Sequence, residues 1–146
     1  MRMFAVLGVV ALLGTSAVGT TDSQGFVRIA PEDVKFETGA DGIGRAVIEG
    51  DPTKAGIYVL RVRFRPGVMS RPHFHREDRL VVVLKGTWWT GTGDVFAPDK
   101  TIGLKPGSFM KHPAGGHHFD GAKNEEVILQ IVGYGPSTTT ELSAQR

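Results

Sequence analysis

The apolar residues of this chain lie in short segments that end at glycine or proline. The 146 residues include 20 glycines and 8 prolines. The clearest segment, residues 57–64, alternates apolar residues with arginines in its second half and ends at Pro66-Gly67. A two-residue period indicates a strand with one buried face. Segments this short and this rich in β-branched residues predict strands rather than helices, so we expect an all-β fold.

Other short segments have the same character. Residues 80–84 are continuously aliphatic and are expected to form a strand in the core. Further candidate strands are 26–30, 34–36, 87–90, 101–104, 108–110, 117–119 and 127–132. Eight or more short strands at this spacing are typical of a sandwich, a jelly roll or a closed barrel. A chain of this length is expected to form one domain.

The N-terminus has the pattern of a secretory signal peptide. A positively charged start precedes an apolar run at 4–13 and a segment of small residues. A membrane anchor would need about 20 consecutive apolar residues, and this run is shorter. We expect a signal peptide at 1–19, cleaved after Ala17 or Gly19, and a mature domain at 20–146. This domain would be periplasmic or secreted and would have no stable membrane span.

Charge and cysteine content exclude several classes of protein. The net charge is +2 and the basic residues are scattered, so no basic patch points to a nucleic-acid partner. The chain has no cysteine, which excludes disulfides and thiolate ligands. Any metal ion must therefore be held by histidines and carboxylates.

Three of the five histidines have a spacing that suits a metal site. His73 and His75 are separated by one residue, so on a strand both side chains leave the same face. His118 lies much later in the chain and could reach the same point from a neighbouring strand. A pair of histidines at this spacing is a weak signal, and surface or core histidines would give the same pattern.

Two groups of residues strengthen the metal hypothesis because they resemble, in order and spacing, the two motifs of the cupin family. The first group is Gly67, His73, His75 and Gly86, and the second is Gly107, Pro113, Gly115 and His118. The resemblance covers about residues 60–132. Within the family, the chain most resembles a subgroup of small exported cupins. The resemblance implies a single cupin-type antiparallel β-barrel, or jelly roll. It also implies one divalent metal ion held by the three histidines, with Fe, Mn, Co, Ni, Cu and Zn all compatible with imidazole.

Arg79 stands where most metal-binding cupins have a glutamate ligand, and a cation cannot coordinate a metal. Three interpretations remain open. In the first, three imidazoles and water hold the ion, and Arg79 helps to attract an anion. Alternatively, Glu77 or Asp78 completes the metal site. In the third interpretation, Arg79 pairs with one of these carboxylates and only fixes a turn.

Other residues near the motifs have alternative roles. His112 precedes Pro113 and is expected at the cavity mouth, as a general acid or base or as an exposed turn residue. His117 should face away from His118. Of Trp88 and Trp89, one ring should point inward. The other should point outward, where it would pack in a homodimer interface. Alternatively, the two rings serve only as ordinary core packing.

The function predicted from these residues is that of a metal-dependent cupin enzyme acting on a small anionic molecule. Dioxygenase-like or enolate-forming chemistry is preferred, with Arg79 orienting the substrate and His112 available for proton transfer. A non-catalytic periplasmic ligand-binding cupin and a cupin isomerase or lyase are the alternatives, because one fold carries many functions. The sequence identifies neither the substrate nor the metal.

Overall fold

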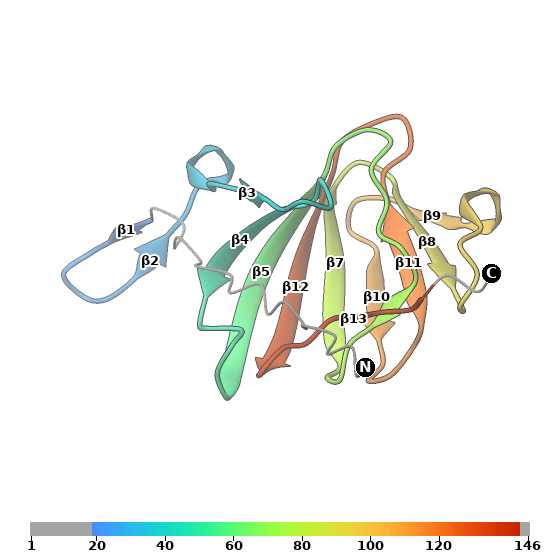
Figure 1. The fold of residues 1–146 in the computed structure, drawn as a ribbon. Helices are drawn as coiled ribbons and strands as arrows, with labels where there is room; N and C mark the ends of the chain where they lie inside the picture. Colours follow the sequence, from blue (N-terminus) through green and yellow to red (C-terminus); the bar gives the residue numbers. More distant parts are fainter. Residues whose placement is uncertain (1–18, 144–146) are drawn as a thin grey trace.

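The described part of the chain, residues 19–143 of a computed structural model, forms an antiparallel β-barrel of two facing sheets (Figure 1). One sheet has the order β10-β7-β12-β5-β4-β3 and the other has the order β13-β6-β11-β8-β9. The described residues contain two short 3-10 turns, Pro31–Asp33 and Pro98–Lys100, and no α-helix. The predicted all-β barrel is therefore confirmed.

The strands of the six-stranded sheet are β3 (Glu37–Thr38), β4 (Gly44–Glu49), β5 (Gly56–Phe64), β7 (Arg79–Lys85), β10 (Phe109–His112) and β12 (Val127–Gly135). Those of the five-stranded sheet are β6 (His73–Phe74), β8 (Trp88–Thr92), β9 (Ile102–Leu104), β11 (His118–Gly121) and β13 (Thr140–Glu141). A separate hairpin of β1 (Thr20–Thr21) and β2 (Val27–Arg28) extends away from both sheets (Figure 1).

The core lies between the two sheets and follows the alternation of β5 and β12. These strands pair along their whole length, from Val127 opposite Phe64 to Gly135 opposite Gly56. Every second residue is buried from Tyr58 to Phe64 in β5 and from Val127 to Ile131 in β12. Burying one such side chain contributes about 1.5–3 kcal/mol. The inward faces of these strands therefore supply both the core and one wall of the cavity described below.

Several local predictions were wrong. Residues 34–36 are not a strand, since the chain turns at Pro31–Asp33 and resumes pairing only at β3. Strand β4 was missed because its residues do not alternate in polarity. Strand β7 is buried on one face only: Leu80, Val82 and Leu84 are 38–44% exposed on the other.

A prediction about stability concerns Gly86, which directly follows β7 and has φ +72°. A Cβ at this position would overlap the carbonyl oxygen of Glu126. We expect Gly86→Ala to lower the free energy of unfolding by about 3 kcal/mol or more, through backbone strain plus the clash. Gly67 is the matched control because it has φ +81° but open space around its Cβ position. Urea denaturation should show a loss of only about 1–2 kcal/mol for Gly67→Ala; equal losses would contradict this account.

The predicted signal peptide lies outside the described residues except at Gly19, so it stays a prediction. Among residues 19–143, no helix has the length and apolar character needed to cross a membrane.

Candidate metal centre

A cavity of about 310 Å³ opens between the two sheets. Its apolar wall includes Phe64, Trp88 and Leu129, and its polar wall contains most of the chain's histidines. Trp88 is fully buried, as predicted for one of the two tryptophans. Trp89 lies outside the cavity lining, with the Lys123 ammonium 4.0 Å from its ring centroid. Its expected place in a homodimer interface stays a prediction.

His73 and His75 line this cavity, and the buried His118 packs against both of their rings. His73 lies on β6 directly opposite His118 on β11, and His75 follows β6 by one residue. Their ring centroids are 4.3 to 5.1 Å apart. One ligand atom from each ring lies within 4.8 Å of the others, a spacing that could hold one metal ion.

The backbone fixes how these three rings present their nitrogens. Each ring has Nδ1 near a backbone carbonyl oxygen: Arg71 for His73 (2.7 Å), Thr138 for His75 (2.9 Å) and Gly116 for His118 (2.9 Å). A carbonyl can only accept, so each Nδ1 carries the proton and each Nε2 keeps its lone pair. This is the arrangement that orients metal-binding histidines. Nε2 of His118 is buried and has no hydrogen-bond partner among the described residues, which fits a vacant ligand atom.

Arg79 lies buried beside this cluster. Its Nη1 donates to Nε2 of His75 at 3.2 Å, its Nε donates to Glu77 at 3.0 Å, and its Nη2 donates to the hydroxyl of Ser137. The ion pair is largely shielded from water, with the Arg79 and Glu77 side chains 9% and 11% exposed. The contact with His75 means that a metal ion and Arg79 compete for the same lone pair.

Neither Glu77 nor Asp78 is placed with the three histidines. Glu77 also accepts a hydrogen bond from the Tyr58 hydroxyl at 3.1 Å. Asp78 pairs with Lys111 at 2.7 Å on the surface and accepts a hydrogen bond from the backbone of Ala114. In this structure Arg79, and neither of the two carboxylates, therefore contacts the histidine cluster.

The expected position of His112 was wrong. It ends strand β10 and is 4% exposed, so it is neither an exposed turn residue nor at the cavity mouth. Its ring centroid lies 3.8 Å from that of His118 and 5.6 Å from that of Trp88. The proline that follows His112 suggested a turn, but strand pairing continues to His112 itself, which is opposite Arg79.

Asp120 is a cavity residue that sequence reasoning missed. It lies two residues after His118 on β11, faces the same side and is 5% exposed. Its Oδ2 lies 3.8 Å from Nε2 of His118. Strand periodicity from His118 could have identified it, whereas the adjacent His117 faces outward and pairs with Asp94 at 2.5 Å.

Burial determines the protonation of the cluster. Burial and the Arg79 charge lower the pKa of His75 to about 2, and burial with the neighbouring histidines lowers the pKa of His112 to about 2. Burial also lowers the pKa of His73 and of His118. Burial raises the pKa of Asp120. The four rings are therefore neutral at pH 7, the form that binds metal.

These shifts predict acid sensitivity of the metal-free protein. The unfolded chain binds protons at these histidines near pH 6.5 and the folded chain does not, so stability falls as pH drops below about 6.5. His75 and His112, whose folded pKa is about 2, would each cost roughly 1 kcal/mol at pH 5.5. Asp120, whose folded pKa is raised, opposes the trend by at most one proton. Urea denaturation at pH 7.5, 6.5 and 5.5 checks this; equal stability at the three values would contradict it.

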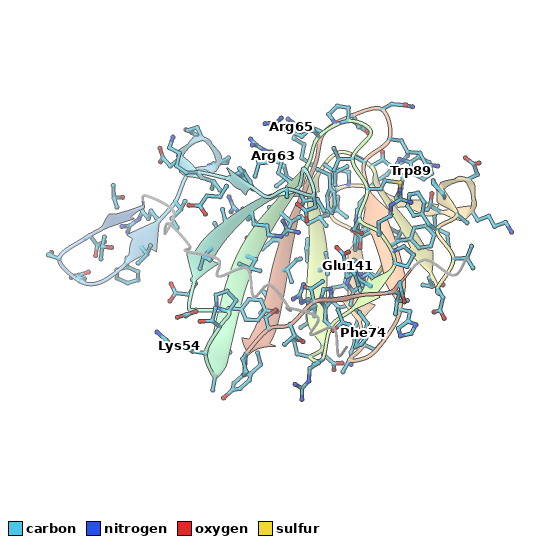
Figure 2. All side chains as sticks on the ribbon, in the orientation of Figure 1. Lys54, Arg63, Arg65, Phe74, Trp89 and Glu141 are labelled. Atoms are coloured by element: carbon cyan, nitrogen blue, oxygen red, sulfur yellow. The ribbon has the colours of Figure 1, made fainter. Side chains whose placement is uncertain are left out.

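Charged side chains surround the cavity mouth. Arg45 and Asp41 form an ion pair of 2.6 Å, and Arg71 and Glu141 also line the opening. Glu141, labelled in Figure 2, lies on β13, the edge strand of the five-stranded sheet, directly opposite His73. The opening therefore carries both signs of charge, while the interior near the histidines carries the buried Arg79.

The fold and this cluster define a class: a small antiparallel barrel with histidines converging in its cavity. The family model described as Cupin matches residues 51–144. The chain therefore belongs to the cupin family. No curated protein matches the sequence.

Solved structures share the fold at low sequence identity. The polyketide cyclase RemF from Streptomyces resistomycificus is 20% identical, with a TM-score of 0.63 and coverage of 80% of this chain and 87% of that one. A sugar phosphate isomerase from Silicibacter pomeroyi is 20% identical, with a TM-score of 0.62 and coverage of 81% and 82%. A DMSP lyase structure is 17% identical, with a TM-score of 0.59 and coverage of 80% and 60%.

Proposed function

We propose that this cupin is a metal-dependent enzyme acting on a small anionic organic molecule. The observation that carries the proposal is the convergence of His73, His75 and His118, with their Nε2 atoms free of protons, beside the buried Arg79. A bound divalent ion would act as a Lewis acid that stabilises negative charge on a substrate oxygen. Because the ligands are neutral imidazoles, they would leave its positive charge largely uncompensated.

Arg79 would orient the anion. In this structure its Nη1 and Nη2 donate to His75 and Ser137. When the lone pair of His75 binds the ion, Nη1 loses its acceptor and can donate to a substrate carboxylate. Two parallel N–H donors from one guanidinium match the two oxygens of a carboxylate. The pairing with Glu77 holds the guanidinium in position for this contact.

The cavity wall would exclude water around the bound molecule. Phe64, Trp88 and Leu129 supply an apolar surface opposite the polar cluster. A cavity of about 310 Å³ suits a small molecule rather than a polymer. Enolate-forming chemistry fits this site, because a developing oxyanion would lie near both the cation and Arg79. Dioxygenase chemistry would require a redox-active metal.

His112 does not fit the role of general acid that its sequence position suggested. A ring with a pKa lowered to about 2 carries no second proton to donate near neutral pH. This ring is therefore not expected to donate a proton to the substrate near neutral pH.

Turnover and binding can be separated in one experiment. Protein reconstituted with Fe(II), Mn(II), Ni(II) or Zn(II) is incubated with β-dicarbonyl compounds and enolisable carboxylic acids. Oxygen consumption and deuterium uptake at carbon are measured, with His118→Asn as the control. We expect turnover that this variant loses. Ligand binding without turnover, unchanged in His118→Asn, would instead identify a non-catalytic binding protein.

Isomerase or lyase chemistry is the alternative within the enzyme class. Both activities occur among the proteins with this fold, in the sugar phosphate isomerase and the DMSP lyase. Deuterium uptake without oxygen consumption would favour them over a dioxygenase.

We also propose that the protein is exported, which N-terminal sequencing of the mature protein would test.

A further inference from the structure

His112 has an environment that the proposed function does not explain. Both ring nitrogens are buried, and neither has a hydrogen-bond partner among the described residues. The three proposed ligands differ, since each has its Nδ1 bonded to a backbone carbonyl. A buried polar group without a partner is costly, and a native fold normally gives it one. The unpartnered ring therefore indicates a ligand.

The position of His112 points to what that ligand is. One of its nitrogens forms a second three-residue group with Nε2 of His118 and a carboxylate oxygen of Asp120, all within 4.8 Å of one another. His118 is shared between this group and the group of His73 and His75. Since Nδ1 of His118 is committed to Gly116, its single free lone pair can bind one ion at a time. The two groups therefore cannot hold two ions at once through His118, and the ion bound there is the one that His112 can reach.

The charges at the two ends of the histidine cluster favour binding of a cation on the side of His112. Arg79 lies at the His75 end, where its guanidinium repels a cation and occupies the lone pair of His75. Asp120 lies at the other end, 3.8 Å from Nε2 of His118. A cation in this cavity is therefore drawn toward His118 and the residues around it.

Strand register explains how a histidine reaches this point. His112 on β10 is directly opposite Arg79 on β7, and cross-strand partners face the same side of a sheet. Position 79 is the motif position where most metal-binding cupins have a carboxylate ligand. The neighbouring strand therefore offers an imidazole beside that position.

We propose that His112 is a fourth imidazole ligand of the ion bound by the histidine cluster. This inference rests on the proposed function, because it requires that the cavity binds a metal ion. The site would then contain four neutral imidazoles, with Asp120 supplying the nearest buried negative charge.

Metal titration of three proteins tests the inference. Wild type, His112→Phe and His112→Asn are stripped of metal, checked for folding by thermal melting, and titrated with Co(II) and Cu(II). The phenylalanine fills the space of the ring and the asparagine keeps a polar group, so a folding defect in one leaves the other usable. His117→Asn is the matched control, since that ring pairs with Asp94 outside the cavity.

We expect both His112 variants to bind Co(II) more than about 100-fold more weakly than wild type, because even indirect partners of a metal are worth about 10–100-fold. The Cu(II) spectrum should also lose the hyperfine coupling of one imidazole nitrogen. Wild-type affinity and an unchanged spectrum in folded His112 variants would overturn this inference and leave the proposed function intact. Failure of wild type itself to bind metal would overturn the proposed function.

Discussion

Replacing His118 with alanine is expected to abolish stoichiometric metal binding. This residue belongs to both groups of potential ligands, and its buried Nε2 has no hydrogen-bond partner among the described residues. Losing a direct ligand should weaken affinity by more than the roughly 10–100-fold that is lost when a residue hydrogen-bonded to a ligand is removed. Isothermal titration of the metal-free variant with Zn(II) or Co(II) measures the effect.

The neighbouring histidine provides the control for this prediction. His117→Ala removes an imidazole one residue away that faces outward and pairs with Asp94. Its metal affinity should equal that of wild type. If His118→Ala and His117→Ala bind metal equally well, the ion is not held by the cavity cluster.

Replacing Arg79 with methionine is expected to lower the free energy of unfolding by about 3–5 kcal/mol, because it leaves a buried carboxylate without its partner. The Glu77 side chain is 11% exposed and would retain neutral partners alone, the hydroxyls of Tyr58 and Ser137 and a backbone N–H. The same substitution frees the lone pair of His75 and removes a positive charge, so metal affinity should rise. Urea denaturation and metal titration measure the two effects.

Two further variants test whether this loss of stability comes from the burial of the ion pair. Lys85 on the same strand forms an ion pair of the same length, 3.0 Å, with Glu126 on the surface. Lys85→Met should therefore cost at most about 1 kcal/mol. The double variant Arg79→Met with Glu77→Gln should recover much of the lost stability, since no buried charge remains. If the single Arg79 variant costs no more than Lys85→Met, the buried pair contributes little.

Anion binding separates the interpretations of Arg79. If Arg79 only fixes a turn, Arg79→Glu lowers stability while the metal and anion affinities of the folded fraction stay the same. If it orients a substrate, the same variant loses affinity for carboxylate ligands. The structure places Arg79 both on Glu77 and in the cavity lining, which makes the second outcome the expected one.

The sequence predicted correctly those strands and site residues that depend on one periodicity or one motif. The alternation at 57–64 predicted β5, and turn residues separated most of the other strands. The spacing of the two motifs predicted that His73 and His118 lie close together. In the structure they are direct partners in the pairing of β6 with β11. These are local patterns that the barrel preserves.

The remaining features depend on contacts between distant segments. The burial of His112 follows from the pairing of β10 with β7, and no residue near Pro113 indicates that the strand continues to this point. The partners of His75 and Arg79 at Ser137 and Thr138 come from a segment about 60 residues later. Such partners are set by topology, so a single sequence does not reveal them.

The central claim is that this cavity holds a metal ion, and elemental analysis of the purified protein tests it most directly. The protein is prepared without chelators and without metal-affinity resin at about pH 7.5, where the buried histidines are neutral. We expect about one divalent transition-metal ion per chain, lost in His118→Ala and retained in His117→Ala. Less than stoichiometric metal in wild type, with none taken up from added Fe(II), Mn(II), Co(II), Ni(II), Cu(II) or Zn(II), would contradict it.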